Sequence, residues 1–198
     1  MEPILRHRYT GKEQITIIKY SVLYRDVFSL NGFVGMLRQW LIDNEYVTGD
    51  DSSFPEVFYL QRENPQLGKQ IQLRWRLQKI PEDAKLWRYD FDIDIDVRGM
   101  KEVEFMHKGK KWKADKGEIE VGVVGNLVID YENAWKNHKW LKRYKDFIIK
   151  NLLRNKFNGQ KAEVHSDGEK LQNIIKEYLK LQSYETQLQD FWPKRPPD

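Results

Sequence analysis

Hydrophobic and polar residues alternate with a period close to two through much of the first 131 residues. Successive side chains of a strand point to opposite faces, so this period predicts β-structure. It is clearest in residues 69–78, where Ile71, Leu73, Trp75 and Leu77 alternate with glutamines and arginines. The same pattern predicts strands at 13–25, 54–63, 89–98, 101–109 and 118–131. Short connections between about six strands favour an antiparallel sheet with one dry and one wet face.

Three other segments have the apolar spacing of amphipathic helices. Ser29 is a suitable N-cap for a helix over 30–44. A long helix is predicted over 133–157, and the sequence KFNGQ is expected to end it. A further helix is predicted over 167–189, followed by a frayed tail. We expect an α+β fold in which the sheet curves around the helix 133–157, with the last helix as an addition.

The size and composition of the chain limit the domain organisation. The chain has 198 residues, of which 40% are hydrophobic, which suits one main domain. We assign residues 1–157 to this domain and 158–198 to a helical extension with a disordered tail. The chain contains no cysteine and its start lacks the apolar run of a signal peptide, so we expect a cytoplasmic protein.

Four aspartates occupy alternate positions in the sequence YDFDIDID. They are Asp90, Asp92, Asp94 and Asp96. Two or three converging carboxylates would bind Mg²⁺, which makes a metal site one interpretation. The other is that these side chains form the wet face of a strand and are neutralised by Arg74 and Arg76 on the preceding strand. We favour the second interpretation and expect no metal.

The sequence contains no motif that indicates catalysis or a cofactor. The four histidines are widely separated, and there is no HExxH, GxSxG, GxxxxGK[ST] or GxGxxG sequence. We therefore predict no catalytic residue and no cofactor, and a binding module is favoured over an enzyme.

Basic charge is concentrated in the segment 133–157. It contains eight Lys or Arg residues and one acidic residue, whereas the whole chain has a net charge of +4. A second basic cluster surrounds Trp112 in KGKKWK, which we expect to form a hairpin turn. Such surfaces are typical of solvated helices but also of binding to membranes, nucleic acids or acidic proteins. The candidate residues are Lys136, Lys139, Arg143, Lys150, Arg154, Lys111 and Trp112.

The predicted order of elements resembles the START-like (helix-grip) superfamily, in which a sheet wraps around a long C-terminal helix. The resemblance covers residues 12–157 and includes YENAWKNHKWLKRYKDFIIKNLL as the gripping helix. The composition also resembles uncharacterised archaeal proteins. The superfamily resemblance implies an apolar ligand cavity between sheet and helix. Its lining would be Trp75, Leu77, Phe91, Ile93, Ile129, Trp140, Tyr144 and Ile148, unless these side chains fill the space themselves.

Two non-enzymatic functions remain open at this point, besides an enzymatic one that would use the aspartate row with a metal. The first is a non-enzymatic carrier or sensor of a hydrophobic small molecule or lipid, held between sheet and helix. The alternative is a nucleic-acid or acidic-partner binder that uses the basic face of 133–157. The apolar side of 167–189 also needs a covering surface, which is either the rest of the chain or, in a homodimer, a second copy.

Overall fold

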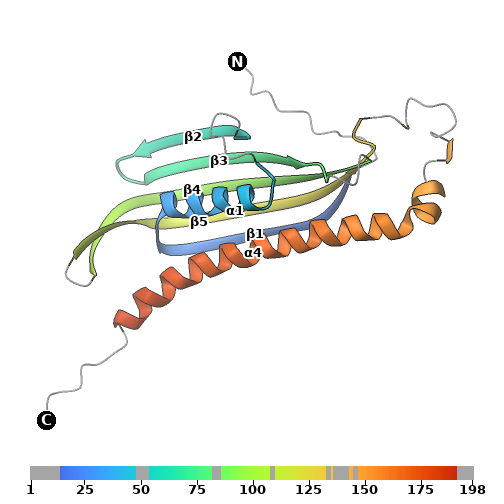
Figure 1. The fold of residues 1–198 in the computed structure, drawn as a ribbon. Coiled ribbons are helices and arrows are strands. Elements are labelled where there is room, and N and C mark those ends of the chain that lie inside the picture. Colours follow the sequence, from blue (N-terminus) through green and yellow to red (C-terminus); the bar gives the residue numbers. More distant parts are fainter. Residues whose placement is uncertain are drawn as a thin grey trace, which may run out of the picture.

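An antiparallel sheet of five strands forms the centre of the computed structural model (Figure 1). The structure describes residues 14–47, 54–81, 86–107, 110–132, 135, 143–144 and 147–190. The strands are β1 (Gln14–Phe28), β2 (Glu56–Asn64), β3 (Gly68–Lys79), β4 (Trp87–His107) and β5 (Lys110–Ile129). They lie in the order β1-β5-β4-β3-β2. The predicted antiparallel sheet is therefore confirmed.

The sheet has five strands because two predicted strands are one. Residues 89–98 and 101–109 both belong to β4, and Gly99 does not end the strand. The pairing with β5 shifts register between Arg98 and Lys101, where Gly99 adopts a φ of 63°. A bulge of this kind bends a strand without ending its ladder. The hairpin predicted at 108–113 is present, because His107 of β4 pairs with Lys110 of β5, but Lys111 and Trp112 belong to the strand β5 and not to the turn.

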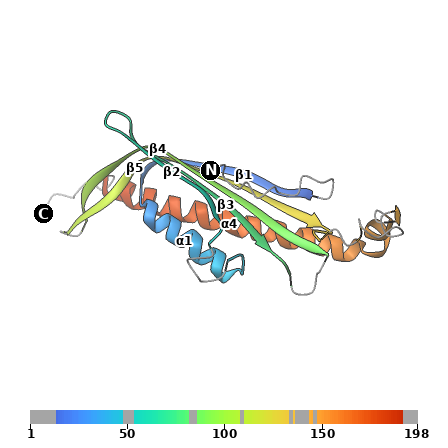
Figure 2. The same cartoon turned by 90° about the horizontal axis from the view of Figure 1, so that it is seen from above.

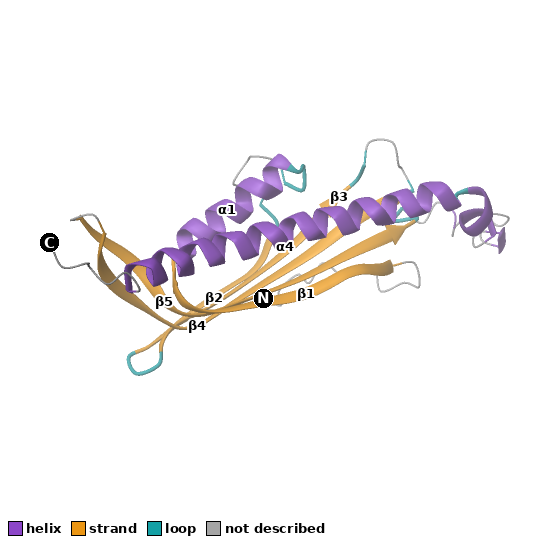
Figure 3. Ribbon diagram, turned by 90° about the horizontal axis from the view of Figure 1, so that it is seen from below, coloured by secondary structure: helices purple, strands orange, loops and turns teal. Residues whose placement is uncertain are grey.

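The helix α1 (Leu30–Asp43) forms where it was predicted. The Oγ of Ser29 accepts a hydrogen bond from the backbone N–H of Gly32 over 3.3 Å, as expected of an N-cap. One side of the helix is buried through Leu30, Phe33, Leu37, Trp40 and Leu41. This apolar side packs against the dry face of the sheet (Figures 2 and 3).

The helix that runs along the sheet is α4 (Arg154–Asp190), which crosses both the predicted break at KFNGQ and the assigned boundary at 157. Its buried residues are Val164, Gly168, Leu171, Ile175 and Leu179. This spacing forms one apolar stripe, and the stripe contacts β1 and β5. An isolated glycine such as Gly159 weakens a helix by only about 1 kcal/mol, so it does not end one that is supported by packing.

The segment predicted as the gripping helix is described only in part, and its residues Trp135, Ile149 and Phe157 pack on the core. Most of 133–146 lies outside the described residues, and its end contains the short π-helix η2 (Ile148–Leu152). The residues after 153 belong to α4. The helix on the sheet is therefore drawn mainly from the part of the sequence assigned to the extension (Figure 3).

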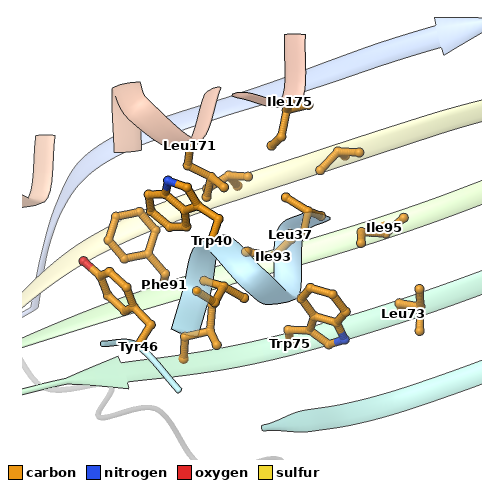
Figure 4. Close-up of a cluster of buried hydrophobic side chains, with 14 of the residues drawn as sticks. Leu37, Trp40, Tyr46, Leu73, Trp75, Phe91, Ile93, Ile95, Leu171 and Ile175 are labelled. Carbon is orange, nitrogen blue, oxygen red and sulfur yellow. The ribbon is translucent and has the colours of Figure 1, made fainter. Parts of the chain in front are cut away.

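The hydrophobic core lies between the sheet and these two helices (Figure 4). Trp75, Phe91 and Ile93 project from β3 and β4 towards Leu37 of α1 and Leu171 of α4. Each of these five side chains is at most 1% exposed. The helices cover one face of the sheet, and the alternating polar residues of the strands form the other face.

Candidate functional site

The residues predicted to line an apolar cavity are core residues. Trp75, Leu77, Phe91 and Ile93 are at most 1% exposed, and Ile129 is 6% exposed. Their neighbours are aromatic rings, with Phe54 centred 4.8 Å from Trp75 and Tyr46 centred 5.2 Å from Phe91. Closely packed protein atoms therefore surround these five side chains.

Two further predicted cavity residues lie away from this core. Tyr144 is 48% exposed and Ile148 is half-buried. Trp140 lies outside the described residues. An interior ligand site therefore stays a prediction from the resemblance.

The predicted basic surface is only partly described. Arg143 and Arg154 are exposed. Lys136 and Lys139 lie outside the described residues, and the side chains of Lys111, Trp112 and Lys150 do as well. Binding through this surface also stays a prediction.

The aspartate row lies on the polar face of β4 and pairs with arginines of β3, as predicted. The Nε of Arg76 lies 3.0 Å from Oδ1 of Asp92, and its Nη1 lies 2.6 Å from Oδ1 of Asp94. The Nη2 of Arg74 donates to both oxygens of Asp96 over 3.0 and 3.1 Å. The register places Arg74 opposite Asp94 and Arg76 opposite Asp92, so each guanidinium reaches two neighbouring carboxylates.

Asp90 has a partner that the sequence analysis missed. The guanidinium of Arg88 donates to both oxygens of Asp90, over 2.7 and 3.0 Å. The two residues are two positions apart on one strand, so they share a face. The spacing of these two residues in the sequence could therefore have predicted the ion pair. The side chain of Asp90 is 1% exposed and that of Arg88 is 16% exposed, which makes this the most deeply buried ion pair that the described side chains form.

A hollow of about 490 Å³ lies on the polar face where Gly122 leaves β5 without a side chain. It is bordered on β1 by Lys19 and Ser21, and on β4 and β5 by Asp94, Asp96 and Glu120. A second hollow of about 150 Å³ lies towards β2 and also includes Asp96. The two hollows therefore adjoin one carboxylate.

The larger hollow is lined by carboxylates and open to solvent. The side chains of Asp94 and Glu120 are 41% and 38% exposed, and that of Asp96 is 20% exposed. The arginines contact these carboxylates from β3 and β4, whereas Lys19 is the cationic side chain of the lining itself. Each of these carboxylates is already paired with an arginine, but a carboxylate can accept about four hydrogen bonds, so the exposed oxygens of Asp94 and Glu120 can accept from a further cationic group.

The carboxylates of this hollow are spaced along β4 and β5 rather than gathered at one point. Within the described part of the chain, no three His, Cys, Asp or Glu side chains are grouped so as to hold a metal ion. The arginines hold the aspartates apart along the strand, which is the arrangement expected of a neutralised polar face.

Comparisons with known proteins show no family. No family model matches the sequence, and no curated protein matches it. A solved structure described as a delta-endotoxin aligns over 61% of this chain and 62% of its own, with 10% identity and a TM-score of 0.37. The chain thus spans less than two thirds of that structure, and a similarity this weak carries no functional argument. In the described helices, no stretch is long and apolar enough to cross a membrane.

Proposed function

We propose that the protein is a non-enzymatic binding module that takes up a cationic group, such as a Lys or Arg side chain of a partner protein, on the polar face of its sheet. The observation that carries this proposal is the hollow above Gly122, bordered by Asp94, Asp96 and Glu120. The helix-covered face has its large side chains buried against one another, which favours the polar face as the binding surface.

The charge arrangement supports a positioned cation rather than general attraction. Arg74 and Arg76 hold Asp94 and Asp96 in place, so these carboxylates are ordered before a ligand arrives. Ser21 donates a hydrogen bond to Oε1 of Glu120 over 3.2 Å, which orients the third carboxylate. Binding of a guanidinium or ammonium group would then cost the protein little side-chain entropy.

The sharpest test fills the hollow without altering the charges. A Cβ added to Gly122 would have its nearest neighbours in Asp94 at 3.9 Å, which is ordinary contact. Gly122→Val should therefore fold, because β-branched residues suit strands, and its side chain would occupy the hollow. We expect an alternating Arg-Gly hexapeptide to bind the unmodified protein and to lose this binding in Gly122→Val, measured by calorimetry and by NMR shifts of the Ser21 and Asp94 amides.

Controls separate this site from general electrostatics. An alternating Glu-Gly hexapeptide should not bind. Glu63→Gln removes a carboxylate from β2, away from the hollow, and should leave the affinity unchanged, whereas Asp94→Asn should weaken binding about fivefold, or about 1 kcal/mol. Equal affinity of Gly122→Val and the unmodified protein would refute the proposal.

A further inference from the structure

The strand β2 forms one edge of the sheet, and its outer side carries no strand in the described structure. An edge strand presents unpaired backbone N–H and C=O groups, which are a template for another strand. The opposite edge is different, because α4 runs beside β1 and contacts it (Figure 1). The edge at β2 has no helix of the described residues beside it in Figure 1.

The centre of β2 lacks the features that usually protect an edge. Natural edge strands carry charges, prolines or bulges that prevent further pairing. The run Val57–Gln61 contains no charge and no proline, and the bulge of β2 lies at its start, between Glu56 and Phe58. Within this run Phe58 is 36% exposed and Tyr59 is 53% exposed. Two large aromatic side chains are thus exposed on an unprotected edge.

The two aromatic side chains point to opposite faces. Tyr59 pairs with Leu73, which is buried under the helices, so Tyr59 lies on the helix side. Phe58 pairs with Arg74 and Leu60 with Gln72, so Phe58 and Leu60 lie on the polar side. A strand added to β2 would have to match an aromatic residue on one face and two apolar residues on the other.

The sequence of β2 itself meets this requirement in an antiparallel arrangement about Tyr59. In that register each Tyr59 lies opposite the other Tyr59, and each Phe58 lies opposite Leu60 of the second strand. Aromatic and aliphatic pairs of this kind stabilise antiparallel sheets. Glu56 of one strand lies opposite Arg62 of the other, so opposite charges face each other at both ends of the pair. No like charges face each other.

We propose that β2 pairs antiparallel with β2 of a second copy of this chain, about a two-fold axis at Tyr59. Such an interface is isologous and closes after two copies. It joins the two sheets into one and places both polar faces on the same side. It depends on β2 alone, so it stands or falls independently of the proposed cation site.

The absence of cysteine from the chain gives a direct test. Cα atoms of directly opposed residues in an antiparallel pair lie about 4.5–5.5 Å apart, which suits a disulfide. Mild oxidation of full-length Tyr59→Cys should give a covalent dimer, because Tyr59 meets its own copy. Leu67→Cys is the matched control, since Leu67 is 61% exposed in the turn of the same hairpin but lies off the edge. It should stay uncrosslinked at the same protein concentration.

A second measurement does not require crosslinking. Light scattering across a dilution series should show a dimer for the unmodified chain. Tyr59→Lys places two ammonium groups opposite each other and should raise the dimer dissociation constant about tenfold or more; Leu67→Lys should leave it unchanged. A monomer at every concentration would overturn the proposal. So would a dimer that persists in Tyr59→Lys without crosslinking in Tyr59→Cys, which would favour the predicted interface on 167–189 instead.

Discussion

The hydroxyl of Tyr46 donates a hydrogen bond to Oδ2 of Asp167 over 2.9 Å, joining the segment after α1 to the middle of α4. A parallel contact lies one turn away along α4, where the hydroxyl of Tyr89 lies 2.5 Å from Oε2 of Glu163 and 2.6 Å from Oε1 of Gln160. These phenol–carboxylate contacts attach α4 to the segment after α1 and to the strand β4. Burial raises the pKa of both tyrosines, and the nearby carboxylates raise it further.

The raised tyrosine pKa values predict a loss of stability in alkali. A phenol whose pKa is higher in the folded protein stabilises the fold fully below its unfolded value of about 10, and this contribution is lost as the pH rises above 10. The free energy of unfolding in urea should therefore fall between about pH 10 and 11, by up to about 1.4 kcal/mol per pH unit for each phenol. Tyr46→Phe and Tyr89→Phe should each reduce this slope, and the double variant should reduce it most. A flat profile through pH 11 would contradict the assignment.

Two glycines of α4 should respond to alanine in opposite directions. A Cβ on Gly168 would lie 2.6 Å from Cγ2 of Ile18 in β1, so the helix would have to move away from the sheet. Gly168→Ala should destabilise the protein by about 1–3 kcal/mol. A Cβ on Gly159 has no neighbour within 4 Å. Gly159→Ala should stabilise it by about 0.5–1 kcal/mol, because glycine is costly within a helix. Thermal melting of both variants checks the pair, and destabilisation by Gly159→Ala would argue against a continuous α4.

The ion pair of Arg88 and Asp90 should be far more important for stability than the exposed pairs. Arg88→Ala leaves the buried Asp90 carboxylate without its cation and should cost about 3–5 kcal/mol. Arg25 pairs with Glu118, but its side chain is 70% exposed, so Arg25→Ala should cost about 1 kcal/mol or less. Chemical denaturation measures both changes. Similar losses in the two variants would show that burial does not set the cost.

A pair of leucine substitutions tests which helix covers the sheet. Leu171 of α4 is fully buried, and Leu171→Ala should destabilise the protein by about 2–5 kcal/mol. Leu152 belongs to the segment predicted from the sequence as the gripping helix, yet it is 73% exposed. Leu152→Ala should change the free energy of unfolding by about 0.5 kcal/mol or less. The reverse ranking would restore 133–157 as the covering helix.

The alternation of residues by itself determined where most strand segments lie, the dry and wet faces and the partners of three aspartates. Local rules suffice for these features, because the side chains of a strand alternate and a register that buries Ile71 to Leu77 must place Arg74 and Arg76 beside the aspartates. The Ser29 cap was predictable for a similar reason, since it depends on a hydrogen bond within one turn.

Only the tertiary structure decided the continuity of β4, the identity of the covering helix and the position of the hollow. By local preference, Gly99 could end a strand and Gly159 could end a helix. Pairing with β5 continues β4 through Gly99, and packing of α4 on β1 supports a helix that continues through Gly159. Likewise, the hollow at Gly122 forms only because β1 and β4 place Ser21 and Asp94 on either side of this glycine. Long-range packing energies exceed the small local preferences of single residues, and a sequence pattern does not contain those contacts.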